Sequence, residues 1–475
     1  MSVLGRPFLG GGNLQRFGWV IVAGLIAGAT PFLPRLLMGA VVLAALTVLI
    51  AFRFEAATLA IVALYPLSEV IGDIAPTSQL GAYKDLVVGL LMIVWIIRVC
   101  TGHTKIPRSL ILGAAGVYAA IAIGMALRAP SLIQAAVGLR TIAFYVGIAF
   151  IAATQLADER SFGRMAIAVM SGAVVVTAYD VIKAISPTSF AGDPNAIGYS
   201  QLVHENNLVH WSESVFFVAD AAILVYIYGM TWKPAVRYTL LCLFAALILL
   251  SGNKTAILGV AVAGVVFFLA EQAHGPRRAQ ALLAIILLGF TAIGLALSGT
   301  LSPDSPTVSG RLAELTAYFP IILANPVGYG TGAVSVVLYL NRYSALLPDV
   351  RVLVPALHNS VSALLLELGL QGLLGFVMVF VLAIVSWLRM QVKIQEPGRR
   401  LALCSCLAIT FAIGAEMTIS PVILSAISMF YFWLFVGAFV AQLSPVNQHP
   451  FNPAIPAAPS HHPAAPDCAA RVFRR

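Results

Sequence analysis

The sequence predicts an all-α protein that crosses a membrane many times, and three observations predict it. First, the 475 residues are 60% hydrophobic and only 10% charged, whereas a soluble domain has a charged fraction of about 25%. Second, apolar windows of about 17 to 25 residues, the length of a membrane-spanning helix, recur from Phe17 to Gln442. Third, mostly short polar breaks separate these windows. Because a chain in lipid has to satisfy its own backbone hydrogen bonds, the windows are expected to be helices.

About fourteen spans fit this pattern, with twelve as the alternative number. They form one polytopic membrane domain over residues 1–442. With the N-terminus inside, most of the 28 lysines and arginines fall on the cytoplasmic side, so both termini are predicted to be cytoplasmic. The net charge of +9 then faces anionic lipid and does not indicate nucleic-acid binding. The span centres are expected near residues 25, 43, 63, 92, 118, 146, 174, 219, 243, 263, 289, 374, 407 and 431.

Two outer loops, at residues 186–207 and about 301–357, are long enough to be functional. The second contains SGRLAELTAYFPIILANPVGYGTG, whose apolar and aromatic residues predict an ordered periplasmic cap. It would have a short amphipathic helix from Arg311, a turn at Asn325 and a glycine-rich return. Beyond the last span, residues 443–475 are too rich in proline to pack, so they are predicted to be a disordered cytoplasmic tail.

Two basic residues stand at informative places in the spans. Arg140, in GLRTIAFY, lies about two helical turns inside its span. A charged side chain at that depth is costly and is treated as functional by default, with snorkelling to the outer headgroups as the alternative. Lys254 stands at the end of its helix, where the snorkelling alternative is stronger.

The stretch HNSVSALLLELGLQG places three polar side chains where an apolar helix begins. The positive end of the helix dipole disfavours imidazolium, so His358 is expected to be neutral near pH 7 and able to accept a proton. Asn359 or Ser360 can cap the exposed N–H groups. Taken alone, this pattern favours a histidine that only caps the helix.

Several motifs together resemble the O-antigen ligase and polymerase superfamily, integral membrane enzymes that move glycans from undecaprenyl diphosphate to an acceptor at the outer face. They are RLAEL from Arg311, NPVGYGTG, HNSVSALLLELGLQG, SGNKTAILG and GLRTIAFY. The third motif has Leu373 where the family often has threonine. In the fourth, Lys254 and Thr255 replace the usual arginine and glycine. The resemblance extends over about residues 84–440.

The resemblance implies an enzyme of the bacterial inner membrane with a GT-C-like helical fold and its active site at the periplasmic face. Transfer from a diphosphate requires that the phosphates be neutralised and that the attacking hydroxyl lose a proton. Guanidinium and ammonium groups suit the phosphates. His358 is therefore expected to be the catalytic base, and Arg311, Lys254 and Arg140 are expected to bind the diphosphate. Supporting roles, mostly in packing, are expected for Asn359, Gly369 and Gly372.

The expected partners are an undecaprenyl-diphosphate-linked oligosaccharide, an acceptor glycan or glycolipid, membrane lipid and other proteins of polysaccharide assembly. No nucleic acid and no cofactor are expected. The sequence has no Asp-x-Asp pair, no Walker-type phosphate loop and no zinc-ligand spacing, so no metal site is predicted.

Three activities remain open at this point. A polymerase for a surface or secreted polysaccharide is slightly favoured, and an O-antigen ligase that transfers to lipid A core is the alternative with the same donor. A lipid-linked glycan flippase is the alternative of another class. It would need a cationic cavity between helices, whereas Arg140 is the clearly intramembrane basic residue and the other motifs gather at one face.

Overall fold

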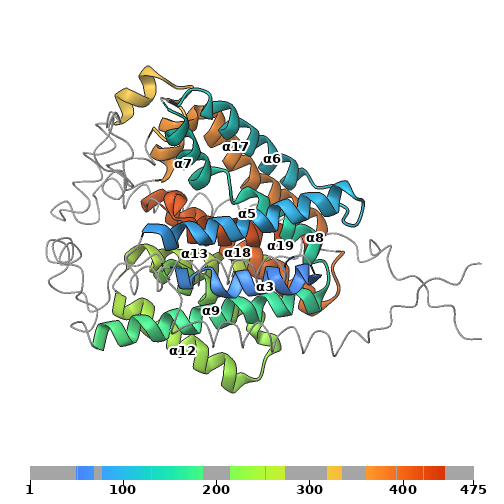
Figure 1. The fold of residues 1–475 in the computed structure, drawn as a ribbon. Helices are drawn as coiled ribbons and strands as arrows, with labels where there is room; N and C mark the ends of the chain where they lie inside the picture. The colour runs from blue at the N-terminus through green and yellow to red at the C-terminus, as the bar shows by residue number, and fades with distance from the viewer. Residues whose placement is uncertain are drawn as a thin grey trace, which may run out of the picture.

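The computed structural model describes residues 50–68, 78–185, 214–272, 318–333 and 360–443, apart from single positions at 51, 130, 252, 392 and 421. Within these residues every regular element is a helix and there is no strand (Figure 1). The all-α prediction is therefore confirmed for this part of the chain. The helices are α3 (Phe54–Leu64), α5 (Ser78–Cys100), α6 (Leu110–Ala126), α7 (Leu132–Ile142), α8 (Val146–Gln155), α9 (Glu159–Ile185), α11 (Ser214–Ile227), η2 (Tyr228–Thr231), α12 (Pro234–Ser251), α13 (Lys254–Gln272), α17 (Ser360–Met390), α18 (Pro397–Ile419), η4 (Val422–Leu424) and α19 (Ala426–Leu443).

The helices lie where the hydropathy of the sequence places them. Every expected span centre from residue 63 to residue 263, and those at 374, 407 and 431, falls inside a helix. The centres near 25, 43 and 289 lie outside the described residues, as do the loop 186–207 and the tail beyond residue 443. Within the described part, five segments are long and apolar enough to cross a membrane. The total of twelve to fourteen spans and the GT-C-like arrangement remain predictions. The five segments are Leu132–Gln155, Glu159–Ile182, Ser360–Met390, Pro397–Thr418 and Ala426–Leu443.

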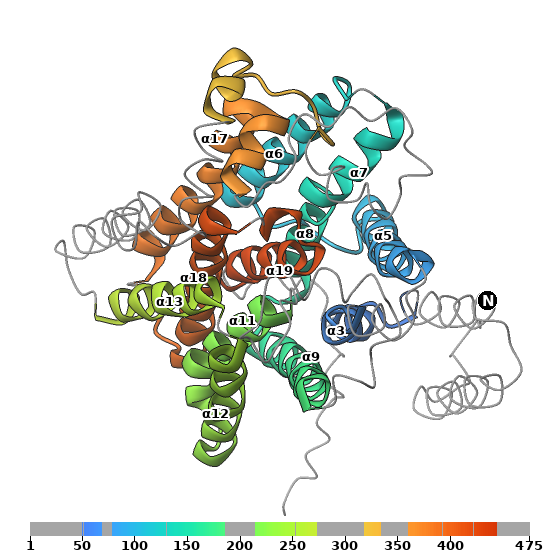
Figure 2. The same cartoon turned by 90° about the vertical axis from the view of Figure 1, so that its left-hand side faces the viewer.

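Helix α19 lies in the middle of the bundle, with α8, α11 and α18 around it (Figure 2). Its sequence AISMFYFWLFVGAFVAQL is apolar on all sides, which is typical of a helix enclosed by other helices. The structure shows this enclosure, since 94% of the 18 residues of α19 are buried. Gly437 allows α8 to approach, because a Cβ atom there would lie 2.7 Å from the Cβ atom of Ala152. The core of the protein is therefore built around α19.

Two further groups of helices flank this centre. On one side α13 packs along α18, and α11 packs against α12, α13 and α18. On the other side α6 packs along α17. Helix α7 follows α6, and the turn at residues 143–145 separates it from α8. Figure 1 shows α6, α7 and α17 grouped at one side of the bundle.

Helix α17 is interrupted within its first three turns. Gly369 has φ 69° and ψ −169°, a backbone conformation that essentially only glycine adopts. The helical hydrogen bonds that this break removes are replaced by bonds to residues 326–330, described below. The break therefore makes a docking place for a loop in the side of the helix.

Candidate active site

The predicted site residues are only partly within the described residues. Arg311, His358 and Asn359 lie outside them. Lys254 is described as the first residue of α13, but its side chain is outside the described part. Arg140 and the two predicted glycines are fully described. The structure therefore shows how the segments that carry the predicted residues are held.

A buried hydrogen-bond junction joins the beginning of α17 to the beginning of α13. The Ser360 hydroxyl donates to the Ser420 carbonyl oxygen (2.7 Å) and accepts from the Ile423 N–H (3.0 Å). The Ser420 hydroxyl in turn donates to Thr255 Oγ1 (3.1 Å). Ser360, Ser420 and Thr255 are all buried. The two predicted motifs around Lys254 and His358 are thus tied together through the segment between α18 and α19.

Asn253 fixes the first turn of α13. Its side-chain oxygen accepts hydrogen bonds from the backbone N–H groups of Thr255 (3.0 Å) and Ala256 (3.2 Å), and the residue is buried. This is the geometry of a helix N-cap. The asparagine of SGNKTAILG therefore has a structural role, and Lys254 directly follows it at the positive end of the helix dipole. The sequence signal for this cap was an asparagine immediately before an apolar helix.

The NPVGYGTG segment docks into the break in α17. The predicted turn is confirmed: the Gly328 N–H donates to the Asn325 carbonyl oxygen (3.0 Å), and residues 318–324 before it are helical. The Tyr329 N–H donates to the Leu366 carbonyl oxygen (2.7 Å), and the Leu370 N–H donates to the Pro326 carbonyl oxygen (2.8 Å). These bonds run on both sides of Gly369, so the loop replaces one turn of helical hydrogen bonding.

Glu367 holds the other end of the same loop. Its side chain is fully buried, and Oε2 accepts a hydrogen bond from the Gly332 N–H (2.9 Å), while the Gly330 N–H donates to its carbonyl oxygen (3.1 Å). This contact could not be predicted from the sequence, because Glu367 and Gly332 are 35 residues apart along the chain. Gly372 leaves room for the side chain of Leu368 in the same helix, because a Cβ atom at position 372 would lie 2.9 Å from Leu368 Cδ1.

Helix α7 contacts both the NPVGYGTG loop and the η4 turn between α18 and α19. The NPVGYGTG loop lies directly on it, because a Cβ atom on Gly138 would lie 2.7 Å from the Gly332 Cα atom. The η4 turn, which is bound to Ser360, also packs against α7. The NPVGYGTG loop and the η4 turn therefore both contact the helix that carries Arg140, and the beginnings of α17 and α13 are linked to this turn through Ser360 and Ser420.

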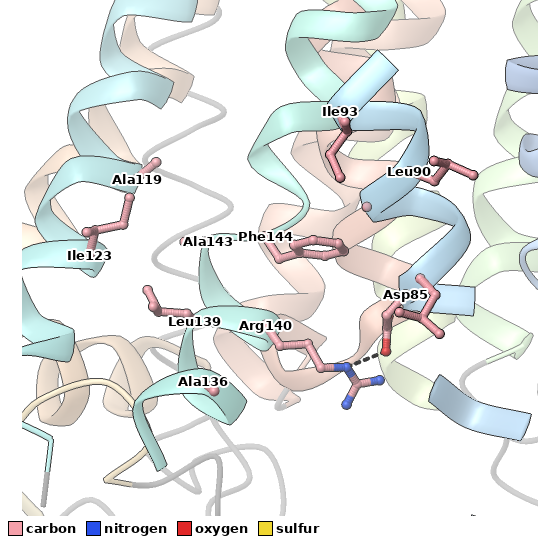
Figure 3. Close-up of a pocket in the computed structure, with 12 residues that line it drawn as sticks. Asp85, Leu90, Ile93, Ala119, Ile123, Ala136, Leu139, Arg140, Ala143 and Phe144 are labelled. Carbon is pink, nitrogen blue, oxygen red and sulfur yellow. Dashed lines mark hydrogen bonds and ion pairs between the residues drawn. The ribbon is translucent and has the colours of Figure 1, made fainter. Parts of the chain in front are cut away.

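Arg140 is held by an ion pair with Asp85 of α5. Its Nε atom donates to Asp85 Oδ2 (2.6 Å), and the two side chains are 27% and 17% exposed (Figure 3). The other carboxylate oxygen, Oδ1, accepts a hydrogen bond from the Tyr145 hydroxyl (2.6 Å). The Tyr65 hydroxyl then donates to the Tyr145 oxygen (2.7 Å). Arg140 is thus a half-buried cation with a fixed carboxylate partner.

A groove of about 870 Å³ opens between α5, α6 and α7 beside this ion pair. Its lining is almost entirely apolar, and several of the lining side chains, including Ile93 and Ile123, are exposed at the surface of the bundle. Figure 3 shows Asp85 and Arg140 together at one end of the groove and Ile93 toward the other. The groove therefore combines an apolar wall with one charged end. The lining residues are Asp85, Leu86, Gly89, Leu90, Ile93, Ala119, Ile123, Ala136, Leu139, Arg140, Ala143 and Phe144.

Sequence reasoning identified Arg140 but not its partners. Asp85 follows Lys84 in an otherwise apolar helix, and an acidic residue in such a helix is itself a signal of function or pairing. Tyr65 and Tyr145 carried no comparable signal, because tyrosine is common in apolar helices. Among the described residues, no group of three or more His, Cys, Asp or Glu side chains could hold a metal ion. That the reaction needs no metal remains a prediction.

The comparisons with known proteins agree with the motifs. Residues 239–377 match the family model described as O-antigen ligase. This range includes α13, the NPVGYGTG loop, the first half of α17 and the residues Lys254, Arg311 and His358. A search of curated proteins found no match. Together with the apolar helices, the match identifies a multi-pass membrane protein of the O-antigen ligase and polymerase type. The match over residues 239–377 thus supports the O-antigen ligase and polymerase superfamily, which the motifs of the sequence resemble.

Proposed function

We propose that this protein transfers a glycan from undecaprenyl diphosphate to the hydroxyl group of an acceptor glycan at the periplasmic face of the bacterial inner membrane. The observation that carries the proposal is the convergence on α7. The NPVGYGTG loop and the η4 turn both pack against the helix that presents Arg140, and hydrogen bonds from this turn through Ser360 and Ser420 reach Thr255 at the beginning of α13. These are the segments that a diphosphate-linked donor would have to contact together.

The chemistry is a displacement at the anomeric carbon of the donor glycan. The acceptor oxygen forms the new bond to that carbon, the bond from the carbon to the diphosphate oxygen breaks, and undecaprenyl diphosphate leaves with the bonding electrons. His358 takes the proton of the acceptor hydroxyl. Arg140, Arg311 and Lys254 neutralise the leaving diphosphate. The beginnings of α13 and α17 add the positive ends of two helix dipoles to the same region.

The apolar groove between α5, α6 and α7 suits the isoprenoid chain of the donor. It is open at the surface of the bundle, so a lipid could enter sideways, and it ends at Arg140, where the phosphates of such a lipid would lie. A hydrocarbon chain gains about 0.8 kcal/mol for each buried CH₂ when it leaves water. Since the chain comes from the bilayer, however, the groove would mainly position the donor.

The proposal is tested by reconstitution of the purified protein in vesicles with an undecaprenyl-diphosphate-linked repeat. We expect longer lipid-linked glycans and free undecaprenyl diphosphate. His358→Ala should abolish this product without loss of membrane insertion. His103→Ala is the matched control, because His103 is an exposed histidine in the loop between α5 and α6. Near-normal product from His358→Ala would remove His358 from the mechanism. Movement of the lipid-linked glycan across the vesicle membrane without new glycosidic bonds would indicate a flippase and refute the proposal.

The same reconstitution separates the two enzymatic alternatives. We favour the polymerase, in which a second lipid-linked repeat is the acceptor. A ladder of longer lipid-linked chains without lipopolysaccharide would support it. If extension is absent until lipid A core is added, and the glycan is then transferred to that core, the protein is an O-antigen ligase.

A further inference from the structure

A chain of three hydrogen-bonded groups stands behind Arg140. Asp85 accepts Arg140 Nε on one carboxylate oxygen and the Tyr145 hydroxyl on the other, both at 2.6 Å, and Tyr65 donates to Tyr145 at 2.7 Å. Tyr65 and Tyr145 are buried, at 3% and 1% exposure. The Asp85 carboxylate is therefore held from two sides.

The far end of this chain is anchored in the core of the bundle. The ring of Tyr65 stacks on Phe430 of α19, with ring centroids 4.2 Å apart and planes inclined by 12°. The ring of Tyr145 meets the same Tyr65 ring edge-on at 6.0 Å. Since packed aromatic rings cannot rotate without disturbing their neighbours, the position of Asp85 is set by the central helix α19 and not by α5 alone.

The contact to Arg140 is made in a way that fixes the direction of the guanidinium group. The ion pair with Asp85 is made through the Nε atom of Arg140, the nitrogen nearest to the arginine side-chain stem (Figure 3). The terminal edge is the part of an arginine that binds phosphate oxygens in pairs. A partner on Nε therefore orients this edge.

We infer that Asp85 is a positioning residue, which with Tyr145 and Tyr65 fixes the Arg140 guanidinium at the charged end of the groove so that it can meet the donor diphosphate. This inference rests on the proposed function of Arg140. It gives a physical reason for an acidic residue next to a site for anions. If only charge mattered, the Asp85 carboxylate would repel the donor diphosphate and weaken donor binding. If Asp85 orients the guanidinium, it strengthens donor binding.

These two arguments predict opposite changes in KM for the donor, which makes Asp85→Asn the decisive variant. Asparagine removes the negative charge with little change of shape. If Asp85 acts only through its charge, the loss of that charge should lower KM. If Asp85 positions Arg140, the loss of the ion pair weakens the contact that orients the guanidinium, so KM for the donor should rise. We expect kcat/KM to fall on the order of tenfold to a hundredfold, since small displacements of a binding group have effects of that size.

Tyr145→Phe supplies a second measurement that keeps the charge of Asp85 in place. It removes one hydrogen bond that holds the carboxylate, so it should raise KM for the donor in the same direction but by less. Glu55→Gln is the matched control. Glu55 forms an ion pair of the same kind with Arg164 (3.0 Å), between α3 and α9, and is not part of the groove. This variant should leave KM for the donor unchanged.

The assay is initial-rate transfer in vesicles with purified undecaprenyl-diphosphate-linked repeat, after the amount of each inserted variant has been measured. Arg140→Gln is assayed in parallel. If Arg140→Gln lowers donor use and Asp85→Asn raises KM, the inference stands. If Arg140→Gln lowers donor use but Asp85→Asn leaves KM unchanged or lowers it, Asp85 has no positioning role. Should Asp85→Asn fail to insert, an unchanged KM in Tyr145→Phe overturns the inference. If Arg140→Gln leaves donor use unchanged, the proposed role of Arg140 fails, and the inference fails with it.

Discussion

The break at Gly369 offers a quantitative test of how the NPVGYGTG loop is held. Gly369→Ala places a Cβ atom where φ is +69° and where the Pro326 carbonyl oxygen would be only 2.5 Å away. The neighbouring atom is backbone, so it cannot give way as the end of a flexible side chain could. The loop has to withdraw from α17, or the helix has to change its path.

The expected loss of stability follows from these contacts. A residue other than glycine in this backbone region costs about 1 to 3 kcal/mol. Withdrawal of the loop breaks five hydrogen bonds between the loop and α17. The N–H groups of Tyr329, Gly330 and Leu370 make three of them, the Gly332 N–H donates to Glu367 Oε2, and Gln371 Nε2 donates to the Val327 carbonyl oxygen. At about 1 kcal/mol for each bond, the total loss is about 6 to 8 kcal/mol. This is a large fraction of the stability of a typical protein.

Thermal unfolding in detergent measures the effect, with Gly375→Ala of the same helix as the control. A Cβ atom on Gly375 would lie 3.4 Å from its nearest neighbour, Ile121 Cδ1, and the residue has ordinary helical geometry. That substitution should be neutral or slightly stabilising, because alanine favours helix over glycine by about 0.5 to 1 kcal/mol. If the Gly369 and Gly375 variants unfold at the same temperature, the loop does not depend on the break, and the reasoning is wrong.

Three more outcomes are expected. Lys254→Arg restores the usual residue of the superfamily and should keep activity, whereas Lys254→Ala should raise KM for the donor in the reconstituted assay. If the alanine variant and the parent protein have the same KM for the donor, Lys254 is only a lipid anchor. Gly259→Ala should destabilise the protein, because the new Cβ atom would lie 2.9 Å from the carboxyl carbon of Glu416. Adding Glu416→Ala to this variant should restore the melting temperature. A double variant that is no more stable than Gly259→Ala would contradict this prediction. Asp158 caps α9 by accepting from the Ser161 N–H (2.7 Å). Partial burial alone would raise the pKa of Asp158, but the hydrogen bonds from Ser161 and the charge of Arg164 outweigh it and lower that pKa. A lowered pKa in the folded state means stability that is present at neutral pH and is lost as pH falls through that pKa. Asp158→Ala should therefore cost about 1 kcal/mol at pH 7 and less in acid, as a melting series over pH would show; a difference that does not change with pH would refute the charge argument.

Hydropathy was sufficient to locate the helices, because the requirement for about 20 apolar residues in a span is strong and local. The turn at Asn325 was also predictable, since Asn-Pro followed by glycines is a local signal. The interruption at Gly369 was not. A glycine in an apolar helix indicates close packing as readily as a change of backbone direction, and the choice depends on Pro326 and Val327, which pack against it from another segment.

In the candidate site, too, single residues could be identified from the sequence, but contacts between residues far apart in the chain could not. The depth of Arg140 in an apolar segment indicated a special role, but its partner Asp85 precedes it by 55 residues. Nothing in the spacing of the two could identify the pair. The link from Ser360 through Ser420 to Thr255 is similar, since each hydroxyl looks unremarkable in the sequence. Three helix ends have to meet before these groups become one junction.

The docking of the NPVGYGTG loop in the side of α17 also determines how its backbone exchanges hydrogen with water. Loop amides normally exchange within seconds, but those of Tyr329 and Gly330 donate to carbonyl oxygens of α17. Their exchange then requires the loop to separate from α17. A short peptide over residues 325–333 would thus report, in a deuterium-labelling experiment, on contact with a helix that begins 27 residues later, at Ser360. Substrate that orders this end of the bundle would be visible there as slower labelling, even though the peptide itself is a loop.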